Sequence, residues 1–135
     1  MAVRAASAAA AIAQAVPAAT QVWVPNDNSG AGLVLTPLSC RYLTLGGMTF
    51  ITGCFQFPAT ASGLAASIGG LPLPVFNQAG AAGMFTLYYG GPSLVLGIPT
   101  IGTNAFAINT IAGAAVSNAT LASSSIRFQF FYPTA

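Results

Sequence analysis

Short apolar runs separated by turn-forming residues are the feature of this sequence that most constrains its fold. From Gln21 onward, runs rich in β-branched and aromatic residues are interrupted at short intervals by Gly, Pro, Asn and Ser. Runs of this length are typical of strands, and turn signals so closely spaced leave little room for the helical crossovers of a parallel sheet. The pattern predicts an all-β fold, an antiparallel, jelly-roll-like β-sandwich.

About eight strands are expected, and no helix after residue 20. The expected strands are TQVWV (20–24), GLVLTPL (32–38), RYLTL (41–45), MTFIT (48–52) followed by CFQF (54–57), FTLYYG (85–90), SLVLG (93–97), FAINTIAG (106–113) and SIRFQFFY (125–132). Pro37 cannot donate to a ladder, so it favours an edge strand or a bulge.

Candidate core residues come from two segments. The aromatic cluster at 128–132 would either line a ligand groove or pack in the core, and strand alternation favours Phe128 and Phe130 as core residues on one face. Ile68, Leu71 and Leu73 lie where neighbouring Gly and Pro residues restrain the backbone, and we expect all three to anchor the sandwich.

The stretch CRYLTLGGMTFITGC, from Cys40 to Cys54, predicts a hairpin with two alternative registers. A two-residue turn at Gly46–Gly47 sets Cys40 opposite Gly53 and turns Cys54 to the other face. A three-residue loop sets the two cysteines directly across from each other, where a disulfide is geometrically feasible. The sequence alone does not choose the register. Because cysteine is among the most buried residue types, we expect two buried free thiols.

Charge is almost absent from this chain. Hydrophobic residues make up 55% of it and charged residues 3%, where a soluble domain carries about a quarter charged residues. The charged residues are Arg4, Asp27, Arg41 and Arg127. We expect Arg41 and Arg127 at strand edges or subunit boundaries, since an unpaired buried charge is unfavourable. Such a surface leaves broad uncharged patches, so we expect much of it to be covered by a partner.

Lipid and nucleic acid are poor candidates for that partner. The mean hydropathy is +0.75, but Gly, Pro, Asn or Ser interrupts every long apolar stretch before it reaches the roughly 20 residues of a spanning helix. The net charge of +2, without any lysine, provides neither a basic stripe for phosphates nor a polybasic patch for anionic lipid. We expect no membrane and no nucleic-acid partner.

Catalytic and metal-binding residues are equally scarce. The chain has no histidine, lysine or glutamate, so the usual general acid and base pairs cannot be assembled. One Asp and two Cys fall short of the four ligands of a structural zinc site. Asp27 lies in PNDNSG, where an Asx turn is expected, and Asn118-Ala119-Thr120, a glycosylation-like triplet, is also expected to be a turn. We expect no enzyme activity, no cofactor and no metal.

Residues 1–20 differ in composition from the rest and are expected to form an arm preceding the sandwich of residues 21–135. The segment begins with MAVRAASAAAAIAQA and contains Ala13-Gln14-Ala15, the A-x-A form of a secretory cleavage site. The alternative is a short helix or docking arm that ends at Val16–Pro17. The Ala-rich middle holds Ile12 but no Leu or Phe, which makes a weak signal sequence, so we prefer the arm.

Three segments, in order along the chain, resemble parts of small bacteriophage virion proteins. YLTLGGMTFITG (42–53) resembles the Tyr-x-x-x-Gly-Asn-x-Val-x-Val-x-Gly hairpin of tail-fibre heads and tail-needle knobs, with Gly47 in place of the usual Asn. ASIGGLPLPV (66–75) resembles their recurring isgLPfp segment, and IRFQFFYPTA (126–135) is similar to their closing strand. Because no fibrous shaft precedes the domain, we expect a small stand-alone virion protein.

The resemblance implies a structural protein of the virion, assembled in the host bacterial cytoplasm as a homotrimer. We expect a capsid cement or decoration protein that binds the major capsid protein, or another virion protein, on the capsid exterior. Arg4, Ile12 and Val16 of the arm are the expected docking residues. The alternative is a receptor-binding knob that recognises host glycan through Tyr88 and Tyr89 in YYGGPS. A tail or neck component is a third hypothesis.

Overall fold

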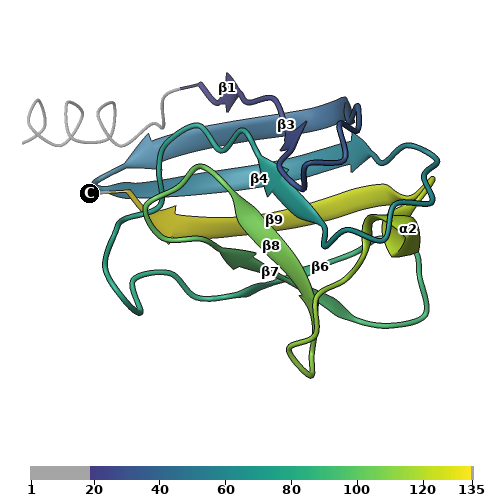
Figure 1. Cartoon of the computed structure of the whole chain (residues 1–135). Coiled ribbons are helices and arrows are strands. Elements are labelled where there is room, and N and C mark those ends of the chain that lie inside the picture. Colours follow the sequence, from purple (N-terminus) through teal and green to yellow (C-terminus); the bar gives the residue numbers. More distant parts are fainter. Residues whose placement is uncertain (1–18, 135) are drawn as a thin grey trace, which may run out of the picture.

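Nine strands and one short helix make up the described part of the computed structural model, residues 19–134 (Figure 1). The elements are β1 (Gln21–Val22), β2 (Asn26–Asp27), β3 (Thr36–Leu45), β4 (Met48–Gln56), β5 (Ser67–Gly69), β6 (Phe85–Leu87), β7 (Val95–Pro99), β8 (Phe106–Thr110), α2 (Asn118–Leu121) and β9 (Ser125–Pro133). Sheet A has the strand order β1-β3-β4-β9, and sheet B has the order β2-β5-β8-β7-β6. Both sheets are antiparallel, which confirms the predicted β-sandwich.

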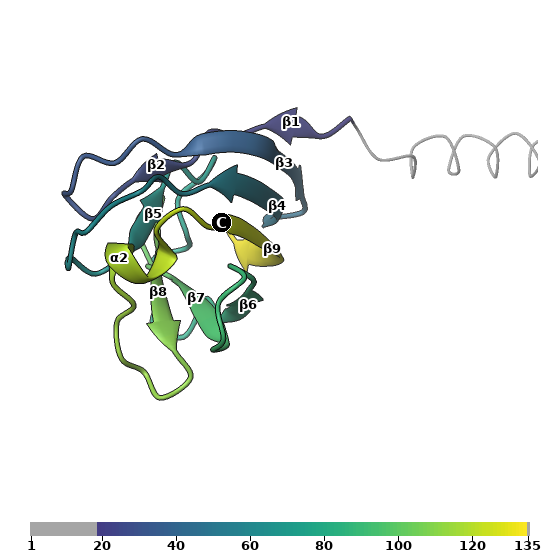
Figure 2. The same ribbon diagram turned by 90° about the vertical axis from the view of Figure 1, so that its right-hand side faces the viewer.

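The chain passes between the sheets in a nested order. β4 pairs with β9 in sheet A and β5 pairs with β8 in sheet B, so nested pairs alternate between the two sheets, as in a jelly roll. β6, β7 and β8 then follow one another as a meander within sheet B. In Figure 2 the view is along the sheets, with β3 and β4 above β7 and β8.

The two sheets are connected along both sides. On one side, three residues lead from β1 of sheet A into β2 of sheet B, and the first of them, Trp23, is held to sheet A by its indole N–H, which donates to the Thr52 carbonyl at 3.0 Å. On the other side, Tyr88 and Arg127 exchange two backbone hydrogen bonds of 2.9 Å, which tie the end of β6 to β9. The sandwich is therefore partly closed, like a flattened barrel.

The hairpin between β3 and β4 adopts the two-residue register. Gly46–Gly47 forms its turn with φ angles of 57° and 79°, as a type I′ turn requires. Cys40 is opposite Gly53 and is buried, whereas Cys54 is half-buried one position further along and points to the other face. Both cysteines are free, as expected, but the expected burial is confirmed for Cys40 alone, because Cys54 lies on the outer face of the sheet.

The thiols should differ in reactivity, because burial raises the pKa of the Cys40 thiol and lowers its thiolate fraction. Alkylation of the folded protein at pH 8 should label Cys54 well before Cys40, and denaturation should equalise the two. Peptide mass spectrometry reports both labels. A Cys40–Cys54 crosslink in the native protein would contradict this register.

The first strands are shorter than predicted because a loop takes up the residues between them. β1 retains only two residues of the expected strand 20–24, and β3 begins at Thr36 instead of residue 32. The Asp27 carboxylate accepts a hydrogen bond of 3.0 Å from the Leu33 N–H, which holds that part of the chain in the loop. The register shift after Pro37 confirms the predicted bulge.

A short helix stands where a turn was predicted. α2 begins at Asn118, and Ser117 caps it by accepting a hydrogen bond of 3.3 Å from the Thr120 N–H. Leu121, at the end of the helix, is fully buried and anchors this single turn to the core. A four-residue helix has no measurable apolar periodicity, so the sequence pattern does not reveal it.

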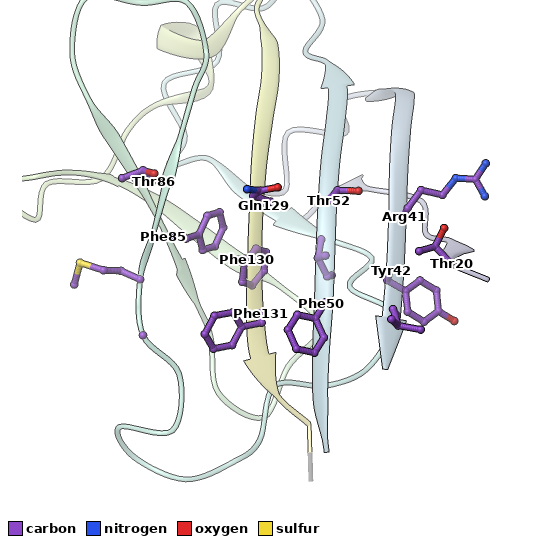
Figure 3. A pocket seen from close by; sticks show the side chains of 14 residues that line it. Thr20, Arg41, Tyr42, Phe50, Thr52, Phe85, Thr86, Gln129, Phe130 and Phe131 are labelled. Carbon is purple, nitrogen blue, oxygen red and sulfur yellow. The ribbon is translucent and has the colours of Figure 1, made fainter. Parts of the chain in front are cut away.

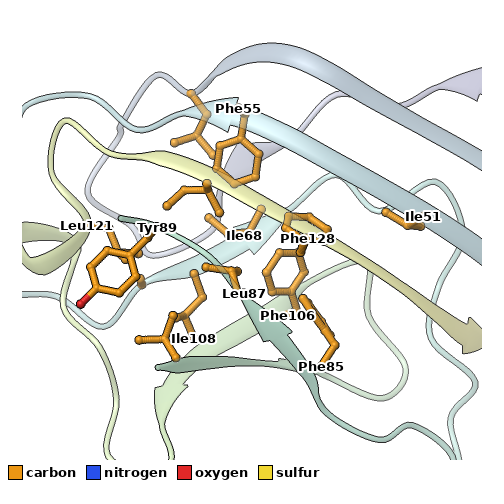
Figure 4. Close-up of a cluster of buried hydrophobic side chains, with 14 of the residues drawn as sticks. Ile51, Phe55, Ile68, Phe85, Leu87, Tyr89, Phe106, Ile108, Leu121 and Phe128 are labelled. Carbon is orange, nitrogen blue, oxygen red and sulfur yellow. The ribbon is translucent and has the colours of Figure 1, made fainter. Parts of the chain in front are cut away.

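Aromatic rings fill the space between the sheets (Figure 4). Phe128 is buried and Phe130 packs against the core cluster, so both are core residues as predicted. Ile68 and Leu71 are also buried, as expected. The prediction for Leu73 is wrong: its side chain is 36% exposed. It follows Pro72 in a bend where strand alternation does not hold, and it contributes only a carbonyl, which accepts a 2.9 Å hydrogen bond from the Tyr132 hydroxyl.

Gly97 on β7 leaves room for the Phe85 ring. An added Cβ at this position would lie 2.1 Å from that ring. Gly97→Ala should therefore lower the free energy of unfolding by about 1–3 kcal/mol through overpacking, measured as the shift of the urea midpoint. Gly63→Ala is the matched control, because an added Cβ there meets nothing within 4 Å. Equal midpoints for the two variants would refute the packing at Gly97.

Candidate functional site

A groove of about 800 Å³ lies on the outer face of sheet A (Figure 3). Thr20 and β3 border it on one side, and residues 83–86, which lead into β6, border it on the other. The side chains on its floor are Arg41, Leu43, Phe50, Thr52, Gln129 and Phe131. We call this feature the sheet A groove.

Strand register divides the floor of the groove into two rows. Leu43, Phe50 and Phe131 are direct partners across β3, β4 and β9 and form an apolar row. The neighbouring row, two residues along each strand, is polar and consists of Arg41, Thr52 and Gln129. Because side chains alternate along a strand, burying Ile51 and Phe128 in the core turns both rows outward.

The apolar row exposes an aromatic pair. The rings of Phe50 and Phe131 lie side by side, with centroids 5.7 Å apart, and are 43% and 64% exposed. Met84, on the β6 border, is 65% exposed. Isolated exposed apolar residues are common, but a contiguous exposed apolar group in a groove is typical of a binding surface for protein.

The groove is suited to binding apolar groups. Among residues 19–134, Arg41 is the one formally charged residue that lines it, and its guanidinium can donate hydrogen bonds to carbonyl oxygens of a bound chain. Within residues 19–134, no cluster of three or more His, Cys, Asp or Glu residues could hold a metal ion. The surface therefore offers apolar contact and a few hydrogen-bond donors and acceptors.

Neither of the two tyrosines predicted to contact glycan lines this groove. Tyr88 is 61% exposed, beside Arg127 at the β6–β9 bridge. Tyr89 is buried in the core, and Gly91 packs against its ring, so the prediction of a glycan contact at Tyr89 is corrected. Arg41 and Arg127 are exposed on the outer face of sheet A.

The docking residues predicted in the arm, Arg4, Ile12 and Val16, lie outside the described part of the structure. The groove itself was not predicted. A sequence signal for it exists in the adjacent pair Phe130–Phe131, since strand alternation requires one ring to face outward when the other is buried.

A buried polar network holds the loops at one end of the sandwich. The Asn118 side chain is fully buried and donates to the hydroxyls of Ser29 and Ser62 at 2.9 and 3.3 Å. Its Oδ1 atom is buried and accepts no hydrogen bond from residues 19–134. Ser29 in turn binds the Asp27 carboxylate through its N–H and hydroxyl, which confirms the predicted Asx-type turn.

Because this network includes the Asp27 carboxylate, it should make the folded state less stable at acid pH. Burial raises the pKa of Asp27, but hydrogen bonds from the Ser29 hydroxyl and from the N–H groups of Leu33, Ser29 and Gly32 together outweigh it and hold the pKa below 3.8. A carboxylate with a lowered folded-state pKa stabilises the fold above the unfolded-state value, and that contribution is lost as the pH falls through the folded-state pKa.

We therefore expect unfolding free energy to decline below about pH 4 in the wild type. Asp27→Asn should be less stable at pH 7 and should show a shallower decline between pH 5 and pH 2. Urea midpoints across that range measure both effects. The same acid dependence in the variant and the wild type would exclude Asp27 as its source.

Comparison of the chain with protein-family models, curated proteins and solved structures finds no match. In the part of the chain from residue 19 to residue 134, no helix is long and apolar enough to cross a membrane.

Proposed function

We propose that this chain is a non-enzymatic structural protein of a bacteriophage virion, which forms a homotrimer and binds the capsid exterior as a cement or decoration protein. The observation that carries the proposal is the exposed Phe50–Phe131 pair in the sheet A groove. Two aromatic rings left in water on a strand surface are stabilised when another protein surface covers them.

The distribution of exposed apolar side chains supports more than one protein contact. Outside the groove, Val34, Leu38, Leu64 and Ile111 are each at least half exposed. Asp27, Arg41 and Arg127 are the only formally charged residues between residues 19 and 134. Contact with a second copy and with a capsid protein would cover separate parts of this surface, through apolar contacts and hydrogen bonds.

The resemblance to small virion proteins supports the phage origin. The first of the three segments covers the turn of the β3–β4 hairpin with the adjoining parts of both strands, the second contains β5, and the third covers most of β9. The first and third segments together supply every floor residue of the groove except Arg41. The resemblance therefore includes the surface that we assign to assembly.

A receptor-binding knob is the alternative, and one observation favours it. The exposed Tyr88 borders a shallow hollow of about 380 Å³, together with Thr86, Arg127 and Gln129. An aromatic ring beside hydroxyl, amide and guanidinium groups can stack on a sugar face and bind its hydroxyls.

Light scattering of the purified protein at micromolar concentration should report a trimer. Phe50→Ser together with Phe131→Ser should shift the population toward monomer without altering the circular dichroism spectrum, because both rings are exposed in the single chain. Ile111→Ser, on a side chain 66% exposed outside the groove, is the control and should remain trimeric. Since the contact is apolar, 1 M NaCl should not dissociate the wild type. A stable wild-type monomer would refute the proposed assembly.

Binding assays should separate the capsid role from receptor recognition. Wild-type protein should co-sediment with phage capsids that lack it, and Tyr88→Ala should co-sediment equally well, because the hollow at Tyr88 has no part in the capsid contact. Binding to host envelope that depends on Tyr88, without any binding to capsids, would favour the receptor-binding knob.

A further inference from the structure

We propose that residues 2–16 of one copy occupy the sheet A groove of a neighbouring copy. The inference rests on the self-association in the proposed function and names the segment that makes the contact. It assigns Ile12 and Val16 to the contact between subunits, in place of the capsid contact expected from the sequence.

The chemistry of the arm matches that of the groove. Residues 2–16 contain nine alanines, two valines and one isoleucine, with Arg4, Ser7 and Gln14 as the polar members. No acidic residue lines the groove, and Leu43, Phe50 and Phe131 form its apolar row. Small alanine side chains allow a backbone to approach a flat strand surface closely, and larger apolar residues such as Ile12 can cover the exposed rings.

The described chain begins at the border of the groove. Thr20 lines the groove, and Ala19 borders an adjoining hollow with Tyr42, Leu43 and Thr44. The point at which residues 1–18 join the described chain is therefore next to the exposed apolar row of the sheet A groove.

The direction of the chain at this point favours a neighbouring copy over the same copy. β1 is antiparallel to β3, with Gln21 opposite Tyr42 and Val22 opposite Arg41. Followed toward the N-terminus, this register leads along β3 toward the Gly46–Gly47 turn and off the end of the sheet. A return to the groove of the same copy needs a reversal within residues 17–19. Pro17 fixes its own φ angle and favours an extended residue before it, which opposes so tight a reversal.

The length of the arm suffices for the groove. Fifteen residues span about 22 Å as a helix and about twice that when extended. The floor from β3 across β4 to β9 covers two strand spacings, about 10 Å. In a helical arm, Ile12 and Val16 lie four residues apart on one face and would contact the apolar row together.

Crosslinking between two different variants tests the contact. Both carry Cys54→Ser, because Cys54 is on the same outer face of sheet A. One also carries Ile12→Cys and the other Thr52→Cys, at the centre of the groove. After subunit exchange and mild oxidation of the mixture, we expect a covalent dimer of the two variants on a non-reducing gel. Ile111→Cys in place of Thr52→Cys is the control and should give no such dimer.

Two crosslinking results would overturn the proposal. One is the absence of the mixed dimer although subunits exchange. The other is a crosslink that forms only within single chains carrying both Ile12→Cys and Thr52→Cys, which would place the arm in the groove of its own copy.

Full-length charge variants provide an independent measurement. Ile12→Asp together with Val16→Asp should dissociate the trimer, because two carboxylates would enter an apolar groove. Ile111→Asp introduces the same change outside the groove and should leave the trimer intact. A trimer that survives both arm substitutions would refute the role of the arm but leave self-association standing, whereas a monomeric wild type would refute the proposed function itself.

Discussion

The rest of the structure depends on the stacking of aromatic rings between the two sheets. Phe130 of sheet A stacks on Phe85 of sheet B with centroids 3.9 Å apart, and Phe128 contacts both Phe85 and Phe106 at 5.3 Å. Glycines opposite these rings, such as Gly53 and Gly97, allow the close approach. Burial of Phe128 fixes which face of β9 points inward, and the position of Phe131 on the outer face follows from that choice.

The register between β4 and β9 therefore determines both which side chains fill the core and which side chains line the groove. β9 pairs with β4 over its whole length, so the outward residues of the two strands are aligned in rows. A shift of one residue would bury Phe131 and expose Phe128, which would remove the groove and empty the core together. The packing that stabilises the fold therefore also positions the side chains of the sheet A groove.

Sequence patterns predict this structure where local chemistry decides it. Gly46–Gly47 locates the turn between β3 and β4, and alternation along the last strand identifies Phe128 and Phe130 as core residues. The register of the hairpin, which the sequence leaves open, is decided by the folded sheet. Sequence patterns do not predict features that depend on contacts between residues far apart in the chain. α2 is held by the hydrogen bonds of Asn118 to loops 56 and 89 residues away. Predicting the groove requires knowing that β4 and β9 are neighbours in sheet A, and no local sequence signal reveals this pairing.

With so few charged residues, the chain must protect the exposed edges of its sheets from aggregation by other means. Many β proteins prevent edge-to-edge aggregation with charged side chains on exposed strands, and this chain has few to offer. Its first strand in each sheet, β1 and β2, is only two residues long, β3 carries a proline and a register shift, and β6 is tied to β9. Hydrogen-bonding groups along the strands are therefore poorly arranged for adding further strands. Any association between copies should therefore use the faces of the sheets and not their edges, so that a β protein with only four charged residues need not grow into fibres.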